Sequence, residues 1–205
     1  MKTIAALAAS LLVFGASASA EERGAELFAF CSQCHGADGG GNELYLAPAI
    51  AGLPEWYVSG QLQKFRTGMR GTHYDDIGGM RMRPMSMWLR KDEDVAAVAA
   101  HVAELPATNP APTLQGGNAA AGKAIYAPCT ACHAADASGN EQLQGPPLRG
   151  ASDWYLLKSL SKFKAGVRGS NPADQYGIMM SAMAANLADV QAMKDVIAYI
   201  ATFSE

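Results

Sequence analysis

CSQCH at residues 31–35 and CTACH at residues 129–133 together hold all 4 cysteines of this 205-residue chain. In both copies two residues separate the cysteines, and a histidine directly follows the second one. Three kinds of site use cysteines at this spacing: a redox-active disulfide, a zinc site and a covalently attached c-type haem. The choice among them depends on which kind also gives the histidine a role.

Haem attachment uses all three residues of the motif. A redox disulfide of this spacing belongs to a βαβ pattern that the chain lacks, and it leaves the histidine without a function. A zinc site needs four ligands, and neither half has a second cysteine pair or a shared second histidine to complete one. In a c-type haem site the cysteines form two thioether bonds and the histidine binds the iron. The sequence therefore predicts two covalently bound c-type haems, attached through Cys31, Cys34, Cys129 and Cys132, with iron ligands His35 and His133.

A duplication relates the two halves of the chain. At a fixed offset of 98 positions, residues 24–105 align without a gap with residues 122–203. Between the copies, residues 106–117 contain three prolines and a pair of glycines, a composition typical of a linker. We therefore expect a first domain at residues 21–105, a linker at 106–117 and a second domain at 118–205. Each domain is so small that the haem is expected to complete its core.

Residues 1–20 have the pattern of a secretory signal peptide. A lysine is followed by an apolar run over residues 4–14 and by Ala18-Ser19-Ala20, which fits a cleavage site. The run is shorter than the roughly 20 residues that cross a bilayer, and no later stretch is apolar enough to do so. We expect export to the periplasm and a mature chain that begins at Glu21 without a transmembrane segment.

The charge balance argues against a nucleic-acid partner. Without Lys2 the chain has 15 basic and 19 acidic residues, whereas a phosphate-binding surface needs a basic excess. Residues 21–105 carry 8 basic and 12 acidic side chains, while residues 106–205 carry 7 of each. This difference suggests that the two ends dock with different protein partners.

An all-α fold is expected, with three helical segments in each unit. They cover residues 22–30, 55–67 and 92–105 in the first unit, and residues 118–127, 153–165 and 188–203 in the second. Apolar residues recur at helical spacing in the middle segment, and acidic residues begin the last segment of the first unit. Between residues 36–54 and again between residues 68–84, glycine and proline break any regular period.

Methionine is the better candidate for the sixth iron ligand. Both units contain Met-x-x-Met at the same register, as Met82 with Met85 and Met180 with Met183. One member of each pair is expected to bind iron and the other to pack, and spacing alone does not choose between them. Met80, two residues before Met82, and Met179, directly before Met180, are further possible ligands. The two remaining histidines, His73 and His101, align with Asn171 and Tyr199, so neither is a ligand that both units share.

The order of these features resembles the dihaem cytochromes c of the cytochrome c4 family. A CxxCH motif, a proline about a dozen residues on, a Trp-Tyr helix that ends in Lys-Phe-x-x-Gly-x-Arg, then Met-x-x-Met and an amphipathic last helix occur twice over the mature chain. The resemblance implies that Met82 and Met180 are the axial ligands. It further implies roles in orienting the proximal imidazoles or binding haem propionates for Pro48, Pro146, Arg70, Arg168, Trp56 and Trp154, although core packing equally explains the tryptophans.

Histidine and methionine ligation predicts an electron carrier rather than an enzyme. Both axial positions of the iron are then filled, so that the redox state changes without a change of coordination. The expected partners are a redox protein that donates electrons and one that accepts them, and the resemblance implies a terminal oxidase as acceptor. A first alternative is the dihaem subunit of an exported dehydrogenase, such as a flavoprotein sulfide dehydrogenase. A second is a dihaem peroxidase, which requires one haem with an open face.

Overall fold

The computed structural model describes residues 19–203, and within this range the ordered elements are all helices. In these described residues, short β-contacts occur only as isolated bridges, between Asn42 and Ala47 and between Asn140 and Gly145. The expected all-α fold is therefore confirmed. None of the helices in this range is long and apolar enough to cross a membrane.

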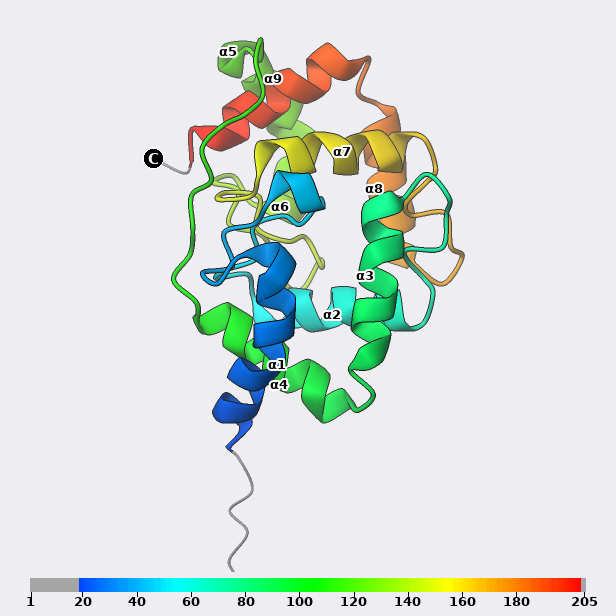
Figure 1. Cartoon of the computed structure of the whole chain (residues 1–205). Helices are drawn as coiled ribbons and strands as arrows, with labels where there is room; N and C mark the ends of the chain where they lie inside the picture. The colour runs from blue at the N-terminus through cyan, green and yellow to red at the C-terminus, as the bar shows by residue number, and fades with distance from the viewer. Residues whose placement is uncertain (1–18, 204–205) are drawn as a thin grey trace, which may run out of the picture.

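The helices of the two units follow each other in the same order. The first unit contains α1 (Ala20–His35), η1 (Glu43–Tyr45), α2 (Glu55–Arg66), α3 (Ile77–Trp88) and α4 (Asp92–Glu104). The second contains α5 (Ala119–Tyr126), η2 (Ala127–Cys129), α6 (Thr130–His133), α7 (Asp153–Lys164), α8 (Gln175–Ala185) and α9 (Val190–Ala201). Figure 1 shows the second unit above the first, with the residues between α4 and α5 running along one side.

Each unit is built around the contact between its first and last helices. Leu27 and Phe28 of α1 pack against Val95, Val98 and Val102 of α4 in one apolar cluster. In the second unit, Tyr126 of α5 forms the equivalent cluster with α9. The backbones approach closely at a matched glycine, because a Cβ at Gly24 would overlap the carbonyl oxygen of Ala97 in α4. The repeated glycine thus fixes how the cysteine-bearing helix crosses the last helix.

Helices α3 and α8 correct the expectation of three helical segments in each unit; α3 begins inside residues 68–84, which were expected to be irregular, and α8 is its counterpart in the second unit. Asp76 and Asp174 cap these helices, each accepting a hydrogen bond from the backbone N–H three residues later. Pro84 lies inside α3, although proline removes one hydrogen bond from a helix. The glycine-rich sequence hid the helices because their starts are stabilised by capping side chains rather than by helix propensity.

A proline splits the cysteine-bearing helix of the second unit. In the first unit, α1 runs without a break into His35, whereas η2 and α6 interrupt the path from α5 to His133. Pro128 stands where the first unit has Phe30, and its missing N–H favours the tight turn seen there. The cysteine motif still ends in a helical turn in both units.

The signal peptide expected at residues 1–20 lies outside the described residues, apart from Ser19 and Ala20. Ser19 caps α1 in a capping box with Glu22.

The segment at residues 106–117 has no helix, and its later part is anchored to the second unit. The backbone N–H groups of Thr113 and Leu114 donate hydrogen bonds to Asp153 at the start of α7, both at 2.7 Å.

Candidate haem sites

The two histidines of the cysteine motifs are buried and oriented in the same way. His35 is 6% exposed and His133 is 8% exposed. The Nδ1 atom of His35 lies 2.8 Å from the carbonyl oxygen of Pro48, and the Nδ1 atom of His133 lies 2.8 Å from that of Pro146. The resemblance implied that the two prolines orient the imidazole rings, and these direct contacts support that role.

These contacts determine which imidazole nitrogen is free to bind a metal. A carbonyl oxygen only accepts, so Nδ1 must carry the proton and donate it. The lone pair of Nε2 is then available, as in metal-binding histidines whose other nitrogen donates to a carbonyl. Burial lowers the pKa of His35 and of His133 more than the hydrogen bond raises it, which favours the neutral, ligating form.

In each motif the second cysteine directly precedes the histidine, and the first lies four residues before it, about one helical turn. Cys34 is exposed and the other three are half-buried, and none of the four forms a disulfide in the described part of the chain. Burial raises the pKa of the Cys31 thiol to about 11, so a redox-active thiolate is disfavoured here. Within residues 19–203, no cluster of three or more His, Cys, Asp or Glu side chains is placed to hold a metal ion such as zinc.

The candidate methionines lie on α3 and α8. Met80 and Met85 are 46% and 39% exposed, and Met179 and Met183 are 53% and 37% exposed. Met82 and Met180 are half-buried and are the less exposed members of their groups. On a helix, positions two apart point to nearly opposite sides, so Met80 and Met82 do not share a face.

The remaining histidines are used elsewhere. The Nδ1 atom of His73 accepts a hydrogen bond from the backbone N–H of Asp75, and its ring stacks on Tyr74 within the same loop. The ring of His101 packs against Phe28, with ring centroids 5.1 Å apart. Their observed contacts therefore give both rings structural roles.

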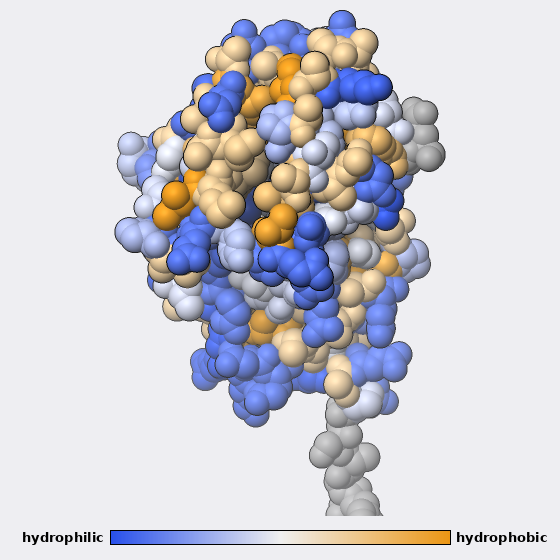
Figure 2. Space-filling model, turned by 180° about the vertical axis from the view of Figure 1, so that it is seen from behind, coloured by the Kyte–Doolittle hydropathy of each residue, from blue (hydrophilic) through white to orange (hydrophobic). Residues whose placement is uncertain are grey.

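The helices that carry the candidate methionines leave many apolar side chains uncovered. Apolar side chains of α3 and α8 are left exposed by the polypeptide, namely Ile77, Met80, Met85, Met87 and Trp88 on α3 and Tyr176, Ile178, Met179 and Met183 on α8. Figure 2 shows a hollow in the upper half of the molecule, bordered by many hydrophobic side chains. Each unit thus offers a cysteine pair, a neutral imidazole and thioether groups, which are the donors that a c-type haem requires.

The face between the units carries an arginine cluster that suits an anion. Arg70 donates to Gln61 of its own unit at 2.7 Å and to Tyr155 of the other unit at 3.1 Å. Arg168 donates to the same Gln61 at 3.3 Å and hydrogen-bonds Tyr57. Neither arginine forms an ion pair with a carboxylate in the described residues, and Nε of Arg70 is buried without a hydrogen-bond partner there. This uncompensated donor fits the carboxylate of a haem propionate.

The tyrosines of this cluster have opposite pKa shifts. Burial raises the pKa of Tyr57, and the nearby Tyr155 raises it further. For Tyr155 burial acts in the same direction, but the charges of Arg70 and Arg168 outweigh it and lower the pKa. The two guanidinium groups therefore act mainly on Tyr155, whose pKa is lowered while that of Tyr57 stays raised.

The two tryptophans differ in their surroundings. Trp154 is 7% exposed, and the Nζ atom of Lys158 lies 4.8 Å from the centroid of its ring system. Trp56 is half-buried and packs edge-on against Tyr57, with ring centroids 5.7 Å apart. Packing accounts for these contacts, so the structure does not single out either tryptophan as a ligand-binding residue.

Sequence reasoning missed four residues that the structure brings together at this face. Lys64 contacts Asp174, and Lys162 contacts Asp76, so that each ion pair joins the two units. All four are matched between the copies, and this retention by both units was the available signal. The pairing itself was hidden, because a repeat shows which residues are equivalent and not which ones meet.

Comparison with known proteins places this geometry in a family context. The family model described as Cytochrome c matches residues 21–106 and again residues 119–204. A thiosulfate dehydrogenase electron acceptor of Thiomonas intermedia is 32% identical over 173 residues, covering 80% of this chain and 74% of that protein.

Two solved structures share the fold. A crystal structure of reduced recombinant cytochrome c4 from Pseudomonas stutzeri matches with a TM-score of 0.68 and 26% identity, covering 88% of this chain and 96% of the other. A thiosulfate dehydrogenase from Marichromatium purpuratum matches with a TM-score of 0.71 and 32% identity. The match covers 88% of this chain and only 40% of the dehydrogenase chain.

Proposed function

Because this chain belongs to the cytochrome c family and is a dihaem electron carrier similar to cytochrome c4, we propose that it carries electrons in the periplasm between a respiratory donor and a terminal acceptor such as an oxidase. Each haem, when bound, supplies an iron that gains or loses one electron. The observation that carries the proposal is the complete repetition of the site, including both histidine–proline contacts at 2.8 Å. Two equivalent redox centres suit a short relay or a two-electron store.

We assign the ligands as follows. Cys31, Cys34, Cys129 and Cys132 form the covalent links, His35 and His133 bind iron through Nε2, and Met82 and Met180 bind it through sulfur. The half-buried positions of the two methionines support this choice over their exposed neighbours. If both an imidazole and a thioether bind the iron, no coordination position would be left for a substrate. The soft thioether also favours the reduced state.

The remaining residues of the site stabilise and orient the cofactor. Pro48 and Pro146 hold the imidazole rings in one tautomer. Arg70 and Arg168 bind anionic edge groups at the face between the units, where both also contact Gln61. Because both arginines meet at this face, haem propionates bound by them would lie close to each other, which would suit electron exchange within the chain.

A second candidate partner is an exported dehydrogenase, of which this chain would be the electron-accepting protein. The relative from Thiomonas intermedia is named as the acceptor of a thiosulfate dehydrogenase. The solved thiosulfate dehydrogenase contains a region that matches most of this chain. Such a function needs a donor enzyme that docks on one unit, and it uses the same ligands. A dihaem peroxidase is disfavoured because both units keep the same candidate methionine.

One set of measurements distinguishes these functions. Purified holoprotein is mixed with reduced thiosulfate dehydrogenase, or with a terminal oxidase, and haem reduction or oxidation is followed by stopped-flow absorption. A free carrier is expected to react with both proteins at rates that saturate with concentration, and to leave peroxide and cyanide unbound. Tight co-purification with a dehydrogenase would favour the subunit role, and rapid cyanide binding at one haem would contradict closed ligation.

Export and domain division are part of the proposal. Cleavage after Ala20 would release a mature chain that begins at Glu21 and contains domains at residues 21–105 and 118–205. The linker at residues 106–117 would stay anchored to the second domain through Asp153. Mass spectrometry of the protein isolated from the periplasm, with sequencing of its N-terminus, tests the cleavage position.

A further inference from the structure

Two ion pairs cross between the units in a reciprocal pattern. The Nζ atom of Lys64, near the end of α2, lies 2.7 Å from Oδ1 of Asp174. The Nζ atom of Lys162, near the end of α7, lies 2.5 Å from Oδ1 of Asp76. The lysines occupy equivalent positions of the repeat, and so do the aspartates. Each unit therefore gives one cation to the other unit and receives one in return.

Each of these aspartates also caps a helix. Asp76 accepts a hydrogen bond from the backbone N–H of Gly79 at 3.0 Å, and Asp174 accepts one from Gly177 at 2.9 Å. The two aspartate side chains are 2% and 7% exposed, respectively. A carboxylate this deeply buried is costly unless a cation pairs with it. The lysine of the opposite unit thus stabilises the helix cap.

The capped helices carry the proposed iron ligands. Met82 lies six residues after Asp76 on α3, and Met180 lies six residues after Asp174 on α8. Six residues correspond to less than two helical turns. A movement of either helix start would therefore displace the sulfur that is meant to reach the iron.

Close packing makes each helix start rigid. A Cβ at Gly79 would overlap the carboxylate of Asp76, and a Cβ at Gly71 would overlap the carbonyl oxygen of Gly79. Glycine occupies both equivalent positions in the second unit, Gly169 and Gly177, where an added Cβ would meet the same obstacles. The cap, the helix start and the preceding loop therefore form one tightly packed body in each unit.

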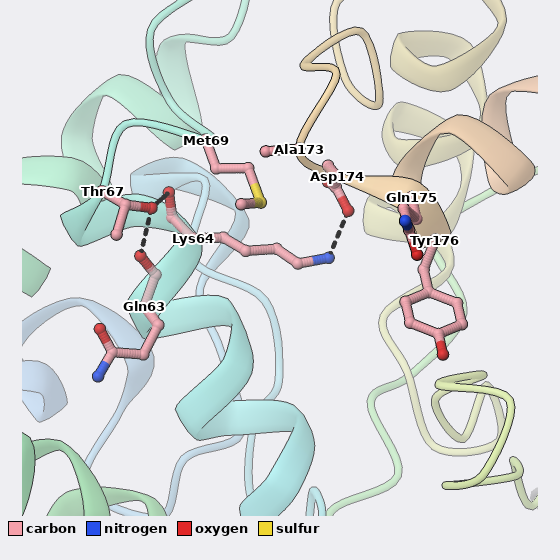
Figure 3. Close-up of a pocket in the computed structure, with 8 residues that line it drawn as sticks. All are labelled: Gln63, Lys64, Thr67, Met69, Ala173, Asp174, Gln175 and Tyr176. Carbon is pink, nitrogen blue, oxygen red and sulfur yellow. Dashed lines mark hydrogen bonds and ion pairs between the residues drawn. The ribbon is translucent and has the colours of Figure 1, made fainter.

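The pair formed by Lys64 lies at a cavity whose described lining contains no second basic residue. It borders a cavity of about 260 Å³ lined by Gln63, Lys64, Thr67, Met69, Ala173, Asp174, Gln175 and Tyr176. Figure 3 shows the side chain of Lys64 extending from α2 towards Asp174. Among these lining residues Lys64 is the sole base. Its removal would leave the carboxylate of Asp174 without a neighbouring positive side chain in the cavity wall.

We propose that Lys64 and Lys162 are positioning residues for the axial methionine of the opposite haem, so that each distal ligand is held in part by the other domain. This inference rests on the proposed ligation by Met82 and Met180. It predicts that a redox partner that shifts one domain against the other alters the ligand field of both irons.

The test uses full-length holoprotein with Lys162→Gln or Lys64→Gln, and the corresponding arginine variants. The axial-methionine methyl signals are recorded by NMR and assigned by the loss of one signal in Met82→Ala and the other in Met180→Ala. Hydrogen exchange at residues 77–82 and 175–180 is measured by mass spectrometry as a second readout. Lys158→Gln is the matched control, because it removes an exposed cation from α7 that also points across the interface without reaching a helix cap.

A crossed response is expected. Lys162→Gln shifts the signal of Met82 and speeds exchange in residues 77–82 about tenfold or more, while Lys64→Gln does so for Met180 and residues 175–180. Arginine restores both readouts, and the control changes neither. Effects within the mutated unit, equal effects on both units, or no effect on exchange would overturn the inference. Absence of methionine signals in the unmodified protein would instead refute the proposed ligation, and the inference with it.

Discussion

The Nδ1 atom of His35 lies 2.8 Å from the carbonyl oxygen of Pro48, and this contact prepares the opposite nitrogen of the ring for metal binding. The loop that supplies the carbonyl returns directly to the cysteine helix, because the backbone N–H of Gly41 donates to the carbonyl oxygen of His35 at 2.7 Å. Gly41 has a φ of 87°, and a Cβ there would overlap the backbone of the loop at Ala49. The loop between the cysteine motif and Pro48 therefore fixes the orientation of the His35 ring.

The number of haems depends on the two cysteine motifs independently. We expect the mass of the mature protein to exceed that of its polypeptide by two haem groups. A Cys129→Ala, Cys132→Ala double variant should retain one haem, because the first unit has its own complete motif. Intact-mass spectrometry measures this directly. Two haems in the variant would contradict attachment through these thiols.

Ligation by methionine is tested one unit at a time. Met82→Ala and Met180→Ala should each remove about half of the weak long-red absorption band that a methionine sulfur bound to ferric haem produces. Met85→Ala and Met183→Ala are the controls, since these side chains are more exposed and should leave the band unchanged. A band that keeps its full intensity in Met82→Ala and falls by about half in Met85→Ala would reverse the assignment in the first unit.

The contact between Arg70 and Tyr155 should contribute to the stability of the interface. Tyr155→Phe removes the hydroxyl that lies 3.1 Å from Nη2 of Arg70, and we expect a loss of about 1–2 kcal/mol in the free energy of unfolding. Ser159→Ala removes a hydroxyl that lies 3.4 Å from Nη1 of Arg168 and also hydrogen-bonds Tyr155, and it should cost less because it leaves the contact between Arg70 and Tyr155 in place. Chemical denaturation followed by far-ultraviolet circular dichroism measures both. Equal losses would show that the hydroxyl of Tyr155 has no special role.

Acid should weaken the helix cap at Asp76. Burial raises the pKa of this carboxyl, but the hydrogen bond and charge of Lys162, with the charge of Arg70 and the N–H of Gly79, outweigh it and lower the pKa. The stabilisation is therefore fully present above the unfolded-state pKa of about 3.9 and is lost as the pH falls through the lower folded-state pKa.

Asp76→Asn provides the comparison for this pH effect. We expect it to cost about 1–3 kcal/mol at pH 7, because the amide oxygen can still cap the helix but Lys162 loses its carboxylate partner, and to reduce the decline in stability below about pH 4. Urea unfolding between about pH 3 and pH 7 measures both curves. Parallel curves for the two proteins would show that Asp76 does not contribute to the acid sensitivity.

The crossing of α1 and α4 should tolerate no side chain at Gly24. Alanine normally stabilises a helix relative to glycine by about 0.5–1 kcal/mol, but here its Cβ would overlap the carbonyl oxygen of Ala97. We expect Gly24→Ala to destabilise the protein by about 1–3 kcal/mol. Gly60→Ala in α2 is the control, because nothing lies within 4 Å of its Cβ position, and it should be neutral or stabilising.

Much of the site was predictable because its chemistry is local. The spacing of Cys31, Cys34 and His35 is set by covalent attachment, and it appears in the sequence whatever the rest of the fold does. The repeat then indicated which methionines both units retain. It did not show that Met82 is less exposed than Met80 and Met85, because side-chain burial depends on the helix that carries them and on its neighbours.

The helix α3 shows where local sequence patterns failed. Gly78, Gly79 and Pro84 all disfavour a helix, and the segment was expected to be irregular. The helix begins nevertheless because Asp76 caps it, and that buried carboxylate depends on a lysine 86 positions away in the other unit. A local pattern contains no information about a partner at that distance.

The sequence by itself determined the covalent chemistry of the protein, its two-fold repetition and its all-helical character, because these depend on residue types at short spacing. Only the tertiary structure decided that the units exchange ion pairs, that Arg70 meets Tyr155, and that the caps of the methionine helices are completed across the interface. The physical reason is burial. A lysine and an aspartate on a surface interact weakly, but in a poorly solvated interior the loss of either one would leave the other as an uncompensated charge.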